Sequence, residues 1–179
     1  MLYRFFVFIR AINVGGRRMT NDELLGPFMR PGFEDVAAYQ AAGNVTFRCE
    51  DPEAAQPERL SPVLTEAYGF EPVIFLRTAG DIRSIVEADP FSADDLSGTD
   101  GRVQVSLMQS VPDEVSVADV LNLVPQEDRI VFAGKEWFWL PKTGVSDSEL
   151  PVGTIEKIVG PMTIRTHGTL SRMFLKFDA

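Results

Sequence analysis

The first eighteen residues constrain the fold more than any other stretch, because an almost unbroken apolar run leads directly into a basic segment. Residues 2–9 (LYRFFVFI) place apolar side chains on both faces of an extended chain, a pattern typical of a central, buried β-strand. Residues 10–18 (RAINVGGRR) contain three arginines and two glycines, and no acidic residue precedes Asp22. The sequence therefore predicts a buried strand that ends in a positively charged loop.

The charge of the chain is unevenly distributed. The 179 residues carry a formal net charge of −9, which disfavours general attraction to nucleic acid or anionic lipid. Residues 1–21 nonetheless carry +4 and residues 151–179 carry +2, which leaves −15 on residues 22–150. If the two ends of the chain meet in space, they form one positive patch on a negative protein.

Cysteine content and hydropathy indicate where such a chain resides. Cys49 is the only cysteine, which excludes an internal disulfide and is typical of a reducing cytoplasm. No apolar run approaches the ~20 residues that a membrane span needs, and the N-terminus lacks the basic region and cleavage site of a signal peptide. We therefore expect a cytoplasmic protein without a membrane partner. The sequence assigns no cofactor, no metal and no oligomeric state.

The first 77 residues predict strands and helices in the order βαββαβ. The expected elements are a strand at 2–9, a helix at 20–30, strands at 35–40 and 45–49, a helix at 57–68 and a strand at 73–77. Thr20 and Glu23 have the spacing of a capping box, and Pro27 is expected to shorten or kink the first helix. This order is that of a ferredoxin-like sandwich, an antiparallel sheet with two helices on one face, and places the chain in the α+β class.

The rest of the chain predicts a second, smaller α+β subdomain. A short helix at 78–88 extends the first domain to residues 1–88, and the Asp-, Ser- and Gly-rich residues 89–101 predict an acidic linker. Residues 102–179 predict the order βαββαα, with a strand at 102–109, a helix at 113–123, a hairpin at 129–132 and 136–140, and helices around 148–159 and 168–177. This order loosely echoes the first half, but we expect no residue-level similarity between the halves.

The loop at residues 10–18 is the first candidate site, with the ligand-binding candidates Arg10, Asn13, Gly15, Gly16, Arg17 and Arg18. The glycine pair permits conformations that expose successive backbone N–H groups, which suit phosphate or carboxylate, and the arginines add guanidinium donors. The helix that follows could add its positive end. The spacing matches neither a P-loop nor a GxGxxG fingerprint. The alternative interpretation is a tight strand-to-helix connection with solvated arginines.

A second group of candidates lies near the C-terminus. Arg165 and Thr169 are the members expected to bind ligand, because a guanidinium fork is a natural partner for an oxyanion. The alternative interpretation is a helix N-terminus capped by Thr166, with surface charges around it.

Several short motifs resemble those of domain-of-unknown-function family 1697. RAINVGG at residues 10–16, Gly-Phe at 32–33 and Gly-Asn at 43–44 are similar to the RGINVGG, GF and SGN signatures of that family. TIRTHGT at residues 163–169 is similar to its C-terminal T-x-R-N-x-x-T pattern. The resemblance implies a ferredoxin-like N-terminal part and no established activity. Asn44, in the Gly-Asn turn, joins the candidate ligand-binding residues.

The chain departs from these signatures at three positions. Ala11, Ala42 and Thr166 stand where the family has Gly, Ser and Asn. The last two changes remove a hydroxyl and an amide from the candidate site, so any activity of the family carries over to this chain less securely.

The sequence contains no recognisable catalytic constellation, because His167 is its only histidine. We therefore predict a small-molecule binding protein whose basic loop takes a phosphate- or carboxylate-bearing ligand, and leave open whether it is an enzyme. One alternative is a single-stranded nucleic-acid module that stacks bases on Phe6 and Phe8, although the net charge disfavours it. If these two rings are buried, no base can stack on them. Another alternative is a protein-interaction module.

Overall fold

The computed structural model describes residues 1–10, 12, 18–30, 32–40, 42–99 and 101–178. The chain forms two compact units, Met1–Arg83 together with Met173–Ala179, and Ser84–Arg172. In the described residues each unit contains one four-stranded antiparallel sheet, which confirms the α+β class. This division differs from the domain boundaries expected from the sequence, because residues 89–101 belong to the second unit and the end of the chain belongs to the first.

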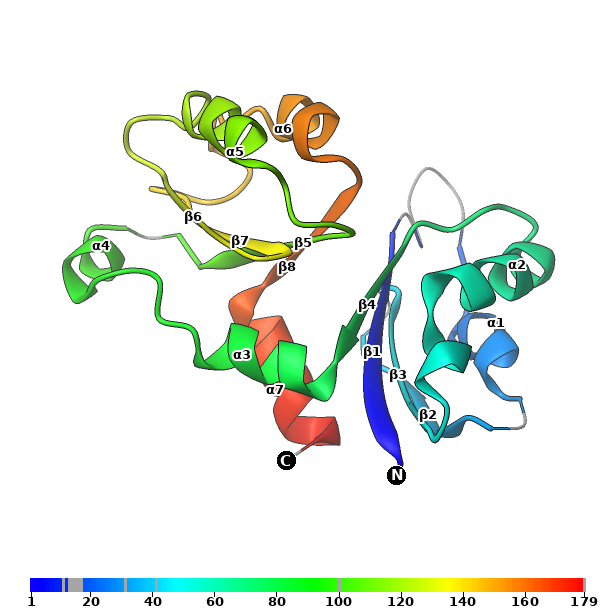
Figure 1. Ribbon diagram of the computed structural model, residues 1–179. Helices are drawn as coiled ribbons and strands as arrows, with labels where there is room; N and C mark the ends of the chain where they lie inside the picture. Colours follow the sequence, from blue (N-terminus) through cyan, green and yellow to red (C-terminus); the bar gives the residue numbers. More distant parts are fainter. Residues whose placement is uncertain (11, 13–17, 31, 41, 100, 179) are drawn as a thin grey trace. The chain divides into compact units, whose positions relative to one another are not determined.

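The first sheet has the strand order β2-β3-β1-β4 (Figure 1). Its elements are β1 (Tyr3–Ile9), α1 (Asn21–Leu25), β2 (Glu34–Ala38), β3 (Asn44–Cys49), α2 (Pro57–Tyr68) and β4 (Ile74–Thr78), followed by α3 (Ala79–Glu87). The observed succession is the βαββαβ order predicted from the sequence. β1 pairs with β3 on one edge and with β4 on the other, so its predicted central position is confirmed.

One face of β1 contributes to the core of the first unit. Phe5, Val7 and Ile9 point to the face that α1 and α2 cover, and they form the core of the first unit together with residues such as Phe47 and Leu64. Burial of these apolar groups is the main stabilising contribution to the unit. The hydroxyl of Tyr68 on α2 donates a 2.7 Å hydrogen bond to a carbonyl of α1, which ties the two helices together, and its burial raises the pKa of that phenol.

The first helix is shorter than expected. A capping box at Thr20 and Glu23 begins it as predicted, but α1 ends at Leu25 and a 3₁₀ turn, Gly26–Phe28, follows. Pro27 lies in this turn, and because proline lacks an N–H and clashes with the preceding helical turn, the α-helix cannot continue through it. The predicted shortening at Pro27 is confirmed.

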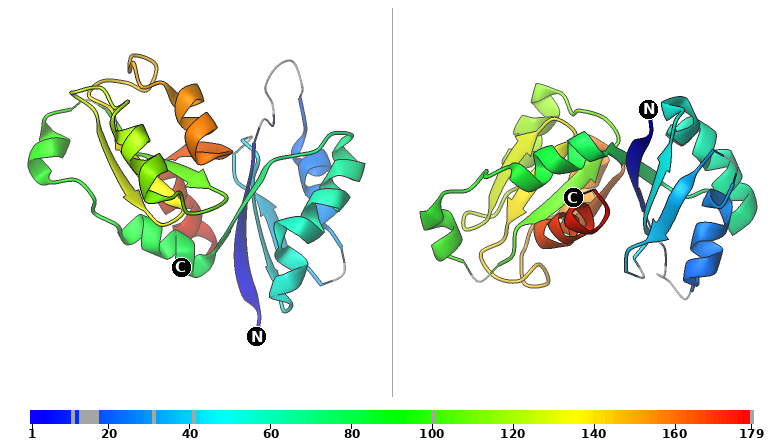
Figure 2. Two further views of the ribbon diagram at one scale, coloured as in Figure 1. Left: turned by 45° about the horizontal axis from the view of Figure 1, so that its top comes forward. Right: turned by 90° about the horizontal axis from the view of Figure 1, so that it is seen from below.

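The second sheet has the strand order β6-β7-β5-β8 and contains a strand that the sequence analysis missed. Its elements are α4 (Ala93–Ser97), β5 (Gln104–Met108), α5 (Glu114–Leu121), β6 (Arg129–Ala133), β7 (Glu136–Leu140), α6 (Val152–Val159), β8 (Met162–Thr166) and α7 (His167–Phe177). Helices α5 and α6 lie side by side on one face of this sheet (Figure 2).

The predicted order βαββαα is therefore wrong for the second half, which runs βαββαβ before its last helix. β8 has only five residues, and a run this short does not distinguish a strand from a connection between two helices, although three of the five are β-branched. Antiparallel pairing with β5 makes it a strand. Both units thus share one chain topology, with β1, β2, β3 and β4 matched by β5, β6, β7 and β8. The expected acidic linker also contains a helix, α4, which begins with a capping box at Ser92 and Asp95.

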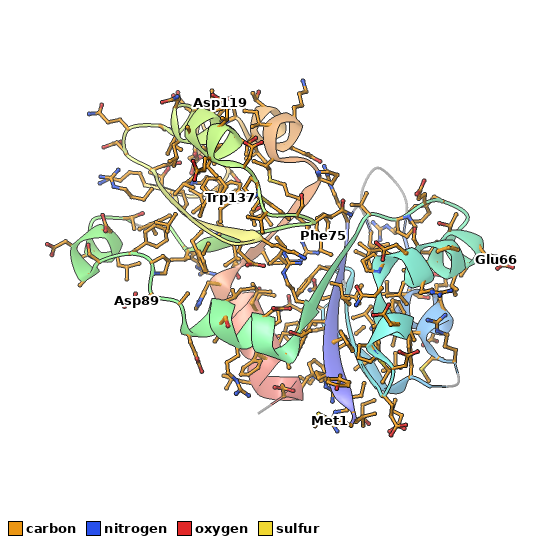
Figure 3. All side chains as sticks on the ribbon, in the orientation of Figure 1. Met1, Glu66, Phe75, Asp89, Asp119 and Trp137 are labelled. Carbon is orange, nitrogen blue, oxygen red and sulfur yellow. The ribbon has the colours of Figure 1, made fainter. Side chains whose placement is uncertain are left out.

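The core of the second unit lies between its sheet and helices α5 and α6 (Figure 3). Trp137 and Trp139 on β7 are both buried there. The indole N–H of Trp139 donates to the buried carboxylate of Asp128, which also accepts from the backbone N–H of Lys142 and the hydroxyl of Ser148. These bonds satisfy the carboxylate inside the unit, so it has a structural role.

The helices are short and amphipathic. α2 has 12 residues and α7 has 11; on α2, Leu64 is buried whereas Glu66 points away from the sheet (Figure 3). In the part of the chain that the structure describes, no helix combines the length and the hydropathy needed to cross a membrane.

Gly43 is required where β3 begins, in the Gly-Asn turn. Its φ is +72°, and a Cβ on this residue would overlap the carbonyl oxygen of Ile9. The two residues are close because the carbonyl of Gly43 accepts a hydrogen bond from the Ile9 N–H at 2.8 Å. The turn and the end of β1 therefore pack too closely for any side chain.

We predict that Gly43→Ala lowers the free energy of unfolding by about 3 kcal/mol, because a left-handed conformation costs ~1–2 kcal/mol and the steric overlap adds to it. Chemical denaturation measures this value. Gly69→Ala is the matched control, since Gly69 has a φ of +71° but no atom near its added Cβ, and should lose only about 1 kcal/mol. Equal losses in the two variants would contradict the close packing at Gly43.

Candidate functional site

The basic loop leaves the sheet at a point held by backbone hydrogen bonds. The N–H of Ile9 donates to the carbonyl of Gly43, and the N–H of Arg10 donates to the carbonyl of Val73 at 3.0 Å. β1 thus ends between the starts of β3 and β4. Arg10 is half-buried at this end of the sheet, whereas Arg18 at the far end of the loop is exposed.

Four predicted site residues, Asn13, Gly15, Gly16 and Arg17, lie outside the described residues. The expected concavity of backbone N–H groups therefore stays a prediction. The described structure positions the ends of the loop, at Arg10 and Arg18.

The helix after the loop is capped by its own residues. The Glu23 carboxylate accepts hydrogen bonds from the backbone N–H and the hydroxyl of Thr20 at 2.8 and 2.9 Å, and the Glu23 N–H donates back to the Thr20 hydroxyl. The bond from the Thr20 backbone is the main cause that lowers the pKa of Glu23. This carboxylate lies at the first turn of a five-residue helix, and the expected contribution of α1 to anion binding stays a prediction.

Asn44 closes the hairpin between β2 and β3. Its side-chain amide donates to the carbonyl of Tyr39 at 3.0 Å, and its own carbonyl accepts the Tyr39 N–H at 2.9 Å. The residue is fully buried. Its observed contacts are therefore structural, at the same end of the sheet as Arg10.

The C-terminal candidates lie on β8 and α7 in the second unit. Arg165 donates from Nη1 to the Thr163 hydroxyl at 2.8 Å and to the Ile164 carbonyl at 2.9 Å. Burial lowers the pKa of Arg165 to about 10, because removal from water destabilises the charged guanidinium. Thr169 is buried, and its hydroxyl lies 2.8 Å from that of Thr166.

The two predicted groups of site residues belong to different units. Arg10, Arg18 and Asn44 are in the first unit, and Arg165 and Thr169 are in the second. The structure describes each group within its own unit, so the single positive patch expected from the two chain ends stays a prediction.

A short repeat connects Arg165 with an arginine that the sequence analysis missed. Residues 77–80 (RTAG) and 165–168 (RTHG) occupy equivalent positions, at the end of the last sheet strand of each unit and the start of the following helix. Arg77 and Arg165 each donate from Nη1 to the carbonyl of the preceding residue, at 2.8 and 2.9 Å. The expected absence of residue-level similarity between the halves is therefore wrong at this motif, and the repeated R-T-x-G in the sequence was the signal.

The two threonines of the repeat also have the same role. The hydroxyl of Thr78 accepts the N–H of Asp81, and that of Thr166 accepts the N–H of Thr169, both at 3.1 Å. Each is the capping contact of a helix start, so the alternative interpretation of the C-terminal motif as a capped helix is confirmed for Thr166. Part of the Arg165 guanidinium likewise serves the strand-to-helix junction.

Among the residues that the structure describes, the His167 ring has no identifiable catalytic partner. Its Nδ1 lies 3.5 Å from the hydroxyl of Ser171, which itself donates to the His167 carbonyl at 3.0 Å as in an ordinary helical turn. Within the described ranges, no group of three or more His, Cys, Asp or Glu side chains is placed to hold a metal ion.

The aromatic pair on β1 is closed to stacking. Phe6 and Phe8 each expose 0% of their surface. A nucleic-acid base therefore has no access to either ring, which removes the observation that motivated the nucleic-acid alternative.

Comparisons with known proteins bear on the fold and the family. Residues 2–138 match the family described as "Protein of unknown function (DUF1697)". Among solved structures, a conserved bacterial protein from Streptococcus pneumoniae matches with a TM-score of 0.73 and 23% identity, and the match covers 98% of each chain. No curated protein matches the chain. The structural likeness supports the α+β fold.

We predict that Thr78→Ala and Thr166→Ala each lower the free energy of unfolding by about 1 kcal/mol, because each removes the hydroxyl that caps a helix. Urea denaturation measures both losses. Thr154→Ala is the matched control, since Thr154 is exposed on α6 and its hydroxyl makes no hydrogen bond to the described residues. Wild-type stability in either capping variant would show that the repeated motif does not stabilise its junction.

Proposed function

We propose, since this chain belongs to the DUF1697 family of proteins of unknown function, that it is a small-molecule binding protein whose basic loop holds a phosphate- or carboxylate-bearing ligand. The observation that carries the proposal is the composition of residues 10–18, which contain three arginines and no acid in a chain of net charge −9. Such a local excess of positive charge attracts small anions.

The described ends of the loop support this proposal. Arg10 is held through its backbone N–H to Val73, so its side chain leaves from a fixed point at the end of the sheet. A donor that is already positioned loses less entropy when a ligand arrives, and therefore contributes more to affinity. Arg18 is exposed and free to reach an anion in solvent.

We infer that Arg165 is a further anion donor, within the second unit. Burial lowers the pKa of this guanidinium, so an arriving anion would offset part of the cost of keeping its charge out of water. Arg165 is a less direct target for mutation than Arg10 or Arg18, because it also bonds the carbonyl of Ile164 at its strand end.

The remaining parts of the proposal concern scaffold and location. We interpret the first unit as a ferredoxin-like sandwich on the basis of its strand order and helix positions. We place the protein in the cytoplasm, because its single cysteine is buried and unpaired.

A thermal-shift scan against nucleotides, sugar phosphates, carboxylates and short single-stranded oligonucleotides tests the function. A ligand at 100 times its Kd stabilises a protein by about 2.7 kcal/mol, which at this size raises Tm by about 5–10 °C. We predict such a shift with one class of small anion and its loss in the Arg10→Ala, Arg18→Ala double variant. Arg59→Ala, at an exposed position on α2, is the control and should retain the shift.

A full shift in the double variant would overturn the assignment of the loop. A shift with oligonucleotides alone would favour the nucleic-acid alternative, and no shift with any compound would favour a protein-interaction module.

A further inference from the structure

A cavity of about 480 Å³ lies in the first unit at the other end of β1 from the basic loop. Its lining includes Tyr3, Arg4, Arg48, Thr78, Gly80 and Asp178, all of them residues of that unit. Arg10 directly follows β1 and lies six residues after Arg4, which separates the two places by roughly 20 Å. The cavity is therefore a distinct location, and its volume is in the range of small-molecule sites, about 300–1,000 Å³.

Two arginines face the same side of the sheet at this cavity. Arg4 on β1 and Arg48 on β3 are direct cross-strand partners, so their side chains point to one face. Like charges directly opposite each other destabilise a sheet. The repulsion between Arg4 and Arg48 therefore lowers the stability of the sheet, so the pair does not serve to stabilise it.

One carboxylate serves both arginines. Asp35 Oδ2 lies 3.4 Å from Arg4 Nη2 and 3.3 Å from Arg48 Nη1. Asp35 lies where the register of β2 shifts against β3. Its φ is +47°, so this non-glycine residue is held in a left-handed conformation while it contacts the two arginines. Two guanidiniums share this one carboxylate, and the second carboxylate of the lining, that of Asp178, lies 3.8 Å from the guanidinium of Arg83.

Arg4 is the less compensated member of the pair. Its side chain is only 7% exposed, and its hydrogen bonds to Asp35 are long, at 3.3 and 3.4 Å. Its Nε is buried and has no hydrogen-bond partner among the described residues. Burial, and secondly the charge of Arg48, lower the pKa of Arg4, whereas the charges of Asp35 and Asp178 act in the opposite direction without cancelling the shift. An anion in the cavity would stabilise this charge.

The first turn of α3 forms another part of the wall. Thr78 and Gly80 line the cavity at the start of this nine-residue helix, where the carboxylate of Asp81 already supplies a negative charge as Glu23 does at α1. Asp81 caps the same turn by accepting the N–H of Thr78 at 2.8 Å. Asp178 also lines the cavity and opposes an anion, although its carboxylate lies 3.8 Å from the Arg83 guanidinium.

We infer that this cavity binds the phosphate group of a small phosphate monoester, with the phosphate oxygens on Arg4 and Arg48 and the organic part in the remaining volume. Two guanidinium forks approach from different strands, and a tetrahedral phosphate offers acceptor oxygens in more directions than a planar carboxylate. The cavity is much larger than a phosphate ion, which leaves room for an organic group. This site is additional to the basic loop and does not depend on it.

Titration of the full chain with phenyl phosphate, followed by calorimetry and by amide NMR, tests the inference. We expect amide shifts at Thr78 and Gly80, and a Kd at least about tenfold weaker in Arg48→Met, which removes one charged fork. Arg48 is the first target because its side chain is 40% exposed, whereas loss of the buried Arg4 threatens the fold. Asp178→Asn should bind several-fold more tightly, because it removes the opposing carboxylate. Arg59→Met is the matched control and should bind like wild type, and circular dichroism should show unchanged folding in all variants.

Inorganic phosphate separates the two parts of the ligand. It should bind more weakly than phenyl phosphate, because it has no organic group to occupy the remaining volume. Wild-type affinity in Arg48→Met, or no binding of phenyl phosphate at millimolar concentration, would overturn the inference. So would amide shifts confined to the ends of the basic loop, in which case the proposed function would stand and the second site would not.

Discussion

The pairing of β1 on both edges is the constraint on which the first unit depends. Its backbone is bonded to β3 and to β4, so its side chains must satisfy two buried faces at once. One face supplies Phe5, Val7 and Ile9 to the core. The other begins with Arg4 and is otherwise aromatic. A strand held on both edges has ends in fixed positions, and both proposed sites lie at those ends.

The two sites show different ways of holding positive charge. At the loop, backbone bonds to Val73 and Gly43 position the chain, and the charge comes from a segment without acids. At the cavity, strand register sets two arginines opposite each other, and Asp35 offsets only part of their repulsion. In both places the positive charge is local to a chain of net charge −9, and this contrast is the basis for proposing small anions and not polyanions as ligands.

The R-T-x-G motif occurs at the same position of the topology that the two units share. At each occurrence an arginine bonds the carbonyl before it and a threonine caps the helix after it. The motif therefore stabilises the turn from the last sheet strand into a helix. Arg165, which the sequence suggested as a ligand donor, has this structural role in addition to any contact with a ligand, and Arg77 has the same role in the first unit.

Local sequence determined most of the elements of this protein. The apolar run of β1, the Thr20 capping box, the proline-shortened first helix and the Gly43 turn follow from properties of single residues and their close neighbours, and all were predicted. Strand β8 and the Arg4–Arg48 pair were decided by tertiary structure. A five-residue strand exists only because β5 pairs with it, and two arginines 44 positions apart become neighbours only through the register of β1 and β3. Interactions between residues close in the sequence can be deduced from the sequence. The register of two strands is a property of the folded sheet, and it is the register of β1 and β3 that places Arg4 and Arg48 together at the cavity.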